Sequence, residues 1–128
     1  MDAASTDRGA GLIATSDDGF ASVDALVEKS FAVMGVLTRV AAENGLSLTQ
    51  LRVLGILRDR RLRMAELADF LGLDRSSLSG LIDRAEQRGL VQRTRNPDDK
   101  RVIEVGMTPI GLEQARAAQE QIRRALTP

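Results

Sequence analysis

The side chains best suited to binding another molecule are arginines and hydroxyls in two short segments. Residues 74–79 read Asp-Arg-Ser-Ser-Leu-Ser, and residues 96–101 read Asn-Pro-Asp-Asp-Lys-Arg. Guanidinium, ammonium and hydroxyl groups donate hydrogen bonds to phosphate oxygens and to the edges of nucleic-acid bases. The two segments therefore point to recognition of an anionic polymer.

Catalysis is poorly supported by the remaining side chains. The chain contains no His, no Cys and no Tyr, which removes thiol chemistry, zinc sites and nearly all nucleophile–base pairs. No two carboxylates are placed to suggest a cleft, since Asp98 and Asp99 lie in a turn exposed to solvent. We expect a protein that is not an enzyme and that binds no cofactor and no metal.

The second segment joins two runs with β-strand character. Residues 89–95 precede it and residues 102–108 follow it, and its Pro-Asp pair is typical of a tight turn. A hairpin rich in Arg and Lys directly after a helix–turn–helix pattern is the sequence form of a winged helix. We call this predicted hairpin, with its turn, the wing.

Five helices are predicted around the wing. Apolar residues at steps of three and four mark a helix from Phe20 that ends at Asn44-Gly45. Thr49 is the predicted cap of a second helix, and residues 65–71 form a short third one that Gly72 ends. Asp74 caps a fourth helix that runs to about Arg88, and Thr108-Pro109 begins the last.

The helical spacing also predicts which residues form the core. The expected inward positions are Leu51, Val53, Leu54 and Leu57 on the second helix, Leu67, Ala68 and Leu71 on the third, Leu78, Leu81, Ile82 and Ala85 on the fourth, and Leu112, Ala115, Ile122 and Leu126 on the last.

Composition and charge are those of a single domain in solution. Hydrophobic residues make up 43% of the 128 residues and charged residues 28%. Residues 1–48 hold 3 basic and 7 acidic side chains, whereas residues 49–108 hold 12 basic and 9 acidic ones, a surplus of +3. No run approaches the ~20 apolar residues of a membrane span, and the N-terminus does not resemble a signal peptide. We therefore expect a cytoplasmic protein without a membrane partner.

Positive charge on the segment that carries the wing favours double-stranded DNA as the partner. On the fourth helix, the buried face leaves Arg75, Ser76, Ser77, Ser79 and Arg84 outward, a narrow polar surface suited to a major groove. In the wing, Arg101 is predicted to enter the minor groove, with Asp99 orienting its guanidinium. Arg93, Arg95 and Lys100 are predicted to contact phosphates. The alternatives are ordinary capping on a solvated face for the helix residues, a plain hairpin salt bridge for Asp99 and Arg101, and solvated strand-edge charge for the other basic residues of the wing.

The resulting fold class is mainly α with a small β-hairpin. It is a winged helix-turn-helix flanked by N- and C-terminal dimerisation helices. Residues 1–19 are expected to be a flexible tail, residues 20–45 the N-terminal dimerisation helix, residues 46–108 the DNA-binding domain and residues 109–128 a C-terminal helix for dimerisation. The predicted interface residues are Phe20, Val23, Val27, Phe31, Leu112, Ala115 and Ile122, because apolar faces with little domain to cover them argue for a partner chain.

In these segments the chain resembles the MarR family of bacterial winged-helix regulators. The resemblance rests on residues 45–54, 64–68, 71–79 and 82–91, on Asp99-Lys100-Arg101 in the wing, and on Val105, Thr108 and Gly111. It covers about residues 20–126. It implies a homodimer on a pseudo-palindromic site, with Asp99 and Arg101 as the family's wing pair. It also implies that many members are repressors released from DNA by a small aromatic or phenolic acid.

Three features depart from that family pattern. Members usually continue into a further helix after the one that follows the wing, whereas this chain stops at Thr127-Pro128. Either the first and last helices build the dimer alone, or this is a shortened chain. Gly80 supplies no side chain where some relatives place a base-contacting residue. The sequence specificity of DNA binding is therefore expected to depend on Arg75, the serines and DNA shape. The absence of Cys excludes the family's thiol switch, and the absence of His argues against its metal-sensing variant.

Two further interpretations stay open. Phe20, Phe31, Met34 and Leu37, with Arg39 and Arg52, can line a site for an aromatic carboxylate, although a dimer core explains the apolar residues better. The alternative function is a winged-helix module that binds protein, or an inactive dimerisation partner without its own DNA specificity.

Overall fold

The structure is a computed structural model that describes residues 19–128. It divides into two compact units, Met1–Val36 and Leu37–Pro128, which are joined within helix α2 (Gly19–Glu43). The described part of the first unit is the N-terminal stretch of α2. The tail predicted for residues 1–19 lies outside the described residues except for Gly19, which begins this helix.

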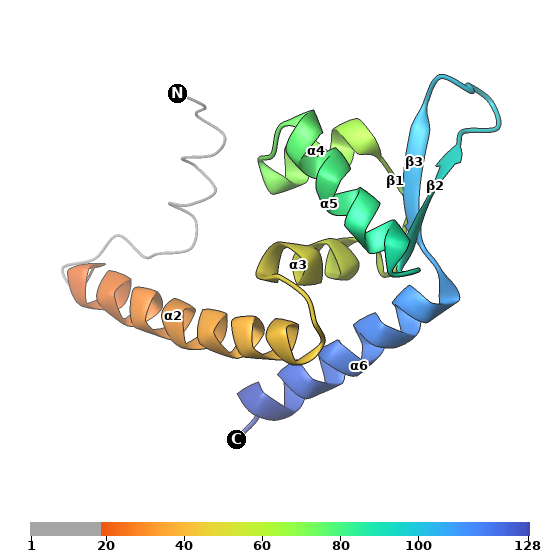
Figure 1. The fold of residues 1–128 in the computed structure, drawn as a ribbon. Coiled ribbons are helices and arrows are strands. Elements are labelled where there is room, and N and C mark those ends of the chain that lie inside the picture. The colour runs from red at the N-terminus through yellow and green to blue at the C-terminus, as the bar shows by residue number, and fades with distance from the viewer. Residues whose placement is uncertain (1–18) are drawn as a thin grey trace. The chain divides into compact units, whose positions relative to one another are not determined.

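The second unit contains the rest of the secondary structure and confirms the predicted fold class (Figure 1). Its helices after α2 are α3 (Leu48–Leu57), α4 (Met64–Leu71), α5 (Arg75–Gln87) and α6 (Pro109–Leu126), and its strands are β1 (Leu62–Arg63), β2 (Val91–Arg95) and β3 (Ile103–Met107). Within the described chain, no helix combines the length and the apolar character that a bilayer crossing requires.

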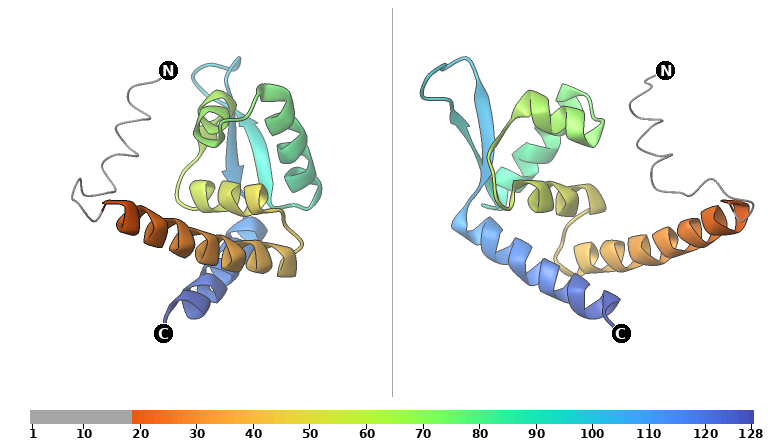
Figure 2. Two further views of the ribbon diagram at one scale, coloured as in Figure 1. Left: turned by 90° about the vertical axis from the view of Figure 1, so that its left-hand side faces the viewer. Right: turned by 180° about the vertical axis from the view of Figure 1, so that it is seen from behind.

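The sheet is antiparallel with the strand order β1-β3-β2. The predicted wing is β2 and β3, paired from Val91↔Met107 to Arg95↔Ile103, and it stands beside α4 and α5 (Figure 2). Strand β1 was not predicted. It has two residues, paired as Leu62↔Val105 and Arg63↔Glu104, which is too short for any alternation of apolar and polar side chains to appear.

Helix ends follow the local signals, with one correction. Gly45, Gly72 and Gly89 adopt positive φ angles of 69°, 66° and 75° where helices end, as the glycine positions predicted. The cap predicted at Thr49 is wrong, because Ser47 is the N-cap of α3. The Ser47 hydroxyl accepts from the Gln50 backbone N–H at 3.1 Å, and the Gln50 Oε1 accepts from the Ser47 N–H at 2.9 Å. This reciprocal capping box places Thr49 inside the helix.

The core of the second unit is aliphatic. All the inward positions predicted for α3 and α5 are buried, and so are Leu67 and Ala68 of α4, whereas Leu71 is half-buried. On α6 the buried residues are Gly111, Ala115 and Ala118. Leu126 is 45% exposed, so its predicted inward position is wrong within this unit. It lies in the last turn of α6, beyond the helix's buried residues.

Arg88 joins the end of α5 to the end of α2. Its Nη1 donates to the Gly45 carbonyl at 2.6 Å and its Nη2 to the Asn44 carbonyl at 3.1 Å. The same Asn44 carbonyl accepts from Gln114 of α6 at 3.0 Å, and the Asn44 amide donates to Gln121 at 2.9 Å. Helices α2, α5 and α6 are therefore connected by one polar cluster, which consists of Arg88, Asn44, Gly45, Gln114 and Gln121.

Candidate nucleic-acid interface

Helix α5 begins with a side-chain cap that organises its first turn. The Asp74 Oδ1 accepts from the Ser77 backbone N–H at 2.7 Å and from the Ser76 hydroxyl at 2.8 Å. These hydrogen bonds, the Ser77 backbone bond first, hold the pKa of Asp74 below its ordinary value. Asp74 therefore stays ionised as the cap of the helix that carries the predicted DNA contacts.

The residues predicted to face outward on α5 do so, with one exception. Arg75, Ser76, Ser77 and Arg84 are exposed. Ser79 is only half-exposed, and both its hydroxyl and its carbonyl accept hydrogen bonds from the Arg93 side chain at 3.2 Å. Its hydroxyl is therefore partly occupied within the molecule.

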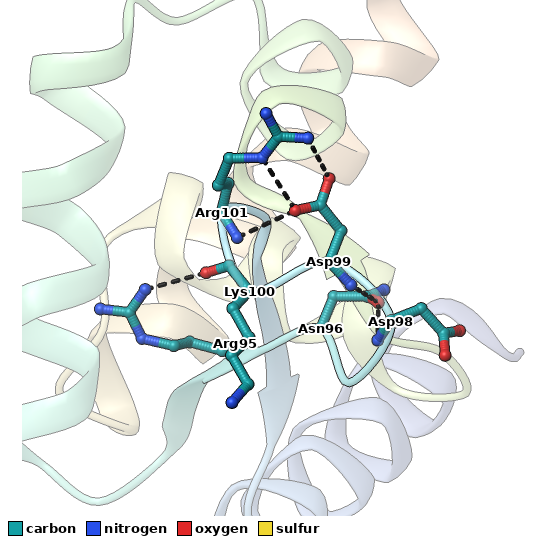
Figure 3. A network of polar contacts seen from close by, with 6 residues as sticks. All are labelled: Arg95, Asn96, Asp98, Asp99, Lys100 and Arg101. Carbon is teal, nitrogen blue, oxygen red and sulfur yellow. Dashed lines mark hydrogen bonds and ion pairs between the residues drawn. The ribbon is translucent and has the colours of Figure 1, made fainter.

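The wing turn is stabilised by its own side chains (Figure 3). The Asn96 Oδ1 accepts from the backbone N–H groups of Asp98 at 2.8 Å and Asp99 at 3.1 Å. The backbone of Asn96 also donates to the Val102 carbonyl at 2.9 Å. An Asn that accepts from the residues following it is a common turn former, and here it closes the loop between β2 and β3.

Asp99 and Arg101 form the paired contact that the sequence predicted (Figure 3). Arg101 Nε lies 3.1 Å from Asp99 Oδ1 and Arg101 Nη2 lies 3.2 Å from Asp99 Oδ2. The side-chain bonds from Arg101 are the main cause of a lowered pKa at Asp99. The Arg101 side chain is nevertheless 91% exposed. One edge of its guanidinium is held by the carboxylate, and the remaining donors face solvent.

The other basic residues of the wing have different surroundings. Arg95 is exposed and donates to the Lys100 carbonyl at 2.8 Å, and Lys100 itself is exposed at the turn (Figure 3). Arg93 is half-buried, with its side chain 24% exposed, and it forms ion pairs with Asp83 and Glu86 of α5. Arg93 is therefore paired with carboxylates of α5, whereas Arg95 and Lys100, the other predicted phosphate contacts, are exposed.

Between α4, α5 and the wing lies a hollow of about 670 Å³. Its lining includes Arg63, Arg75, Arg93, Arg95 and Arg101, and its other residues are Met64, Ala65, Leu78, Ser79, Thr94, Val102 and Ile103. Arg63 is not among the predicted site residues. It enters the lining because β1 pairs with β3, and the only local signal for it was the run of arginines at positions 58–63.

Arg61 reinforces the sheet at the base of the wing. Its Nη2 donates to the Thr94 hydroxyl of β2. On the way it passes over Gly106 of β3, where an added Cβ would lie 3.1 Å from the Arg61 Cγ. A glycine at this position therefore leaves room for the arginine to cross the sheet.

A second cavity of about 530 Å³ lies elsewhere in the same unit. Its lining is Leu37, Leu48, Leu51, Arg52, Leu54, Gly55, Ile56, Arg58, Arg60, Ala115, Gln119 and Ile122. Of the residues suggested for an aromatic carboxylate site, Leu37 and Arg52 are in this lining, whereas Phe20, Phe31, Met34 and Arg39 are not.

The predicted dimerisation residues divide into two groups. Phe20 is 89% and Phe31 68% exposed, Val27 is exposed, and Val23, Leu112 and Ile122 are half-exposed. Ala115 is a correction, because it is only 6% exposed within its own unit and offers almost no surface to a second chain. Its spacing on α6 predicted an inward position, but did not indicate whether its own unit or a second chain would cover it.

Among residues 19–128, no cluster of three or more His, Cys, Asp or Glu side chains is arranged to hold a metal ion.

Comparison with known proteins agrees with this geometry. Residues 44–102 match the model of the MarR family. The HTH-type transcriptional repressor MdtR of Bacillus subtilis (strain 168) is 34% identical over 70 residues, covering 54% of this chain and 45% of MdtR. The chain spans less than half the length of the curated relatives that it matches.

Solved structures extend the likeness beyond the matched segment. The transcriptional regulator Tm0710 from Thermotoga maritima is 27% identical with a TM-score of 0.71, covering 80% of this chain and 73% of its own. NadR in complex with 4-hydroxyphenylacetate has the same fold, at 24% identity and a TM-score of 0.71, covering 79% and 72%. Residues 44–102 therefore match the MarR family, and the described chain has the winged helix-turn-helix fold of solved transcriptional regulators such as Tm0710.

Proposed function

We propose that this protein is a sequence-specific DNA-binding transcriptional regulator that acts as a homodimer on a pseudo-palindromic operator. The observation that carries the proposal is Arg101, whose guanidinium is oriented by Asp99 and whose side chain is 91% exposed at the end of the wing. An arginine prepared in this way suits a narrow minor groove, where negative potential is concentrated. Beside the wing, the first turn of α5 presents Arg75, Ser76 and Ser77 for the major groove.

The hollow between α5 and the wing supports the same proposal. Arg63, Arg75 and Arg95 line it together with Arg101. Phosphate contacts supply a large part of the affinity of such proteins and also position the elements that read the bases. A DNA strand that passes between α5 and the wing would meet these arginines.

The first experiment is fluorescence anisotropy with duplex DNA from the region upstream of the protein's own gene. A scrambled duplex at the same near-physiological salt is the control. We expect the native duplex to bind more tightly by ~10³ or more, at two chains per duplex. Equal weak binding to both duplexes, or none, would contradict sequence-specific regulation, and self-association without DNA binding would favour the protein-interaction alternative.

Arg101→Ala tests the wing directly. The contact is expected to contribute about 1–3 kcal/mol to specific binding, so the dissociation constant rises roughly tenfold or more. Arg39→Ala is the matched control, since this arginine is on α2 and makes only a long 3.9 Å ion pair with Glu43. Equal effects of the two substitutions would argue against a DNA contact at Arg101.

The exposed apolar residues of α2 support the homodimer. Phe20, Val27, Phe31 and Met34 are all exposed, and apolar residues concentrated along one helix mark interaction sites. Two α5 helices related by two-fold symmetry would read half-sites about one helical turn of DNA apart.

Repression and release by a small ligand are the finer parts of the proposal. The relative MdtR bears the name of a repressor, and NadR was solved with 4-hydroxyphenylacetate. In this chain the 530 Å³ cavity offers a mainly aliphatic lining and three arginines, Arg52, Arg58 and Arg60, which suits a small aromatic carboxylate.

The ligand proposal is tested by adding 4-hydroxyphenylacetate to the protein–operator complex. The anisotropy is expected to fall, whereas the uncharged alcohol analogue should have little effect. Gly55→Leu should abolish the response by filling the cavity, since nothing lies within 4 Å of a Cβ at this position. An unchanged response in Gly55→Leu would place any ligand elsewhere.

A further inference from the structure

Arg93 occupies a different environment from the other arginines of the wing. Its Nη1 lies 2.8 Å from the Asp83 Oδ1 and also pairs with the Glu86 carboxylate. Its Nη2 donates to the Ser79 hydroxyl and carbonyl, both at 3.2 Å, and its backbone N–H donates to the Glu86 Oε2 at 3.1 Å. Both terminal nitrogens of the guanidinium are therefore engaged by α5.

This environment is unsuited to a phosphate contact. A guanidinium binds phosphate through two parallel N–H groups on one edge. Every such edge of the Arg93 guanidinium includes Nη1 or Nη2, and both of these nitrogens already bond to α5. Two carboxylates also face the Arg93 guanidinium and offset its positive charge, which weakens its attraction for a phosphate.

The three partners of Arg93 are spaced as one face of a helix. Ser79, Asp83 and Glu86 follow one another at four and three residues along α5. A single side chain from β2 therefore holds about two turns of α5. The bond to the Ser79 carbonyl fixes backbone as well as side chain.

We infer that Arg93 is a positioning residue, which fixes the orientation of α5 relative to the wing so that both reach one DNA site together. The inference rests on the proposed DNA-binding function and assigns Arg93 a role other than phosphate contact. The sequence specificity of binding depends on this orientation, because Arg75 and Arg101 must meet adjacent grooves at the same time.

Arg95 provides the matched control for this role. It lies two residues along the same strand, so its side chain is on the same face of the sheet as that of Arg93. It is exposed, and its side chain donates to the Lys100 carbonyl of the wing itself. It is free to contact a phosphate.

The dependence of affinity on salt distinguishes the two arginines. Each lost phosphate contact reduces the slope of log affinity against log salt by about 0.9. We expect Arg95→Met to lower the slope by about this amount for each chain bound. Arg93→Met should keep the wild-type slope and lose roughly tenfold or more in the affinity for the operator relative to scrambled DNA. A slope reduced in Arg93→Met as in Arg95→Met would overturn the inference.

Exchanging the charges of Arg93 and Glu86 distinguishes a positioning role of Arg93 from a direct contact between its guanidinium and DNA. Arg93→Glu alone should abolish specific binding, and the double variant with Glu86→Arg should recover part of it by restoring the pair in reverse. A phosphate contact could not be recovered in this way, so absence of rescue would count against the inference. Arg93→Lys retains the charge without the planar fork, and we expect it to lose specificity with an unchanged slope even if Arg93→Met folds poorly.

A measurement without DNA tests the geometry independently. Because the chain contains no Cys, Gln87→Cys and Asp98→Cys introduce one pair of spin-label sites per chain, on α5 and the wing turn, and mixing with an excess of unlabelled protein leaves at most one labelled chain in a dimer. We expect a narrow distribution of label distances when Arg93 is present and a broader one in Arg93→Met. An unchanged distribution would overturn the inference. If the wild-type protein prefers no duplex, the proposed function is rejected. The distance measurement uses no DNA, so it still shows whether Arg93 fixes α5 relative to the wing.

Discussion

Two arginines of the wing show how the surroundings of a side chain decide its use. Arg101 is held by one carboxylate on an exposed turn and keeps donors in solvent. Arg93 meets two carboxylates and a serine and is largely covered. Both are arginines of the same hairpin, so residue type and position alone predict a DNA contact for each, in the minor groove for Arg101 and on a phosphate for Arg93. The difference is the number of acceptors that α5 brings to Arg93.

At Gly111 the backbone leaves no room for a side chain. A Cβ there would overlap the carbonyl oxygen of Leu90, which is backbone and cannot rotate away. We expect Gly111→Ala to reduce the free energy of unfolding by roughly 1–3 kcal/mol or more. Gly55→Ala is the control in a helix with open space around the position, and it should stabilise the fold by up to about 1 kcal/mol. Urea denaturation of both variants compares them, and similar shifts in the two would contradict the packing argument.

At two helix starts of this fold, a single side chain caps the helix by accepting a hydrogen bond from a backbone N–H of its first turn. Asp74 begins α5 by accepting from Ser77, and Thr108 begins α6 by accepting from the Gly111 N–H at 3.0 Å. Thr108 also donates to the Gly89 carbonyl at 2.5 Å. Thr108 therefore joins the start of α6 to the turn between α5 and β2, which positions α6 at the base of the wing.

The cap at Asp74 predicts a dependence of stability on pH. Because folding lowers the pKa of this carboxyl, its stabilising contribution is fully present above the ordinary carboxyl pKa of about 3.9. It is lost as the pH falls through the lowered value. The difference in urea midpoint between wild type and Asp74→Asn should therefore be constant near neutral pH and shrink below about pH 4. A difference that grew on acidification would contradict the ionised cap.

Arg88 predicts a second effect at the scale of elements. Removing it in Arg88→Ala leaves the carbonyls of Asn44 and Gly45 without these donors, which should cost about 1 kcal/mol because the site is open to solvent. Arg84→Ala, one turn earlier on the exposed face, should leave the free energy of unfolding nearly unchanged. Thermal denaturation distinguishes them, and an equal loss in both would indicate a general effect of removing charge from α5.

At the scale of the whole molecule, the described chain leaves a long apolar surface without a partner. Phe20 and Phe31 are the largest exposed apolar side chains of α2. Apolar side chains on a surface helix are normally covered when they recur at helical spacing. A second copy of the chain is the partner that the proposed operator symmetry requires.

Phe31→Glu tests assembly at this scale. We expect the substitution to shift the protein from dimer to monomer in analytical ultracentrifugation, and to weaken operator binding because two half-sites can no longer be occupied together. Phe70→Glu is a control, since Phe70 is a half-exposed aromatic on α4, away from α2 in the sequence. A dimer that persists in Phe31→Glu would move the interface away from this part of α2.

The sequence by itself determined the helices, most of their buried positions and the turn of the wing, because these depend on residues within about four positions of each other. The αL glycines at helix ends, the Asp74 and Thr108 caps and the Asp99–Arg101 pair are all local in this sense. Strand β1 was missed because two residues carry no periodic signal, and the Ser47 cap because Thr49 offered a competing hydroxyl nearby.

Only the tertiary structure decided which distant residues meet. Arg88 reaches Asn44 across 44 positions, Arg61 reaches Thr94 across 33, and Arg93 turns toward α5 rather than toward solvent. Spacing along α6 marked Ala115 as inward, but whether its own unit or a second chain covers it depends on how the helices pack. Such contacts follow from the path of the chain in space, which local spacing and side-chain type do not specify at the level of single contacts.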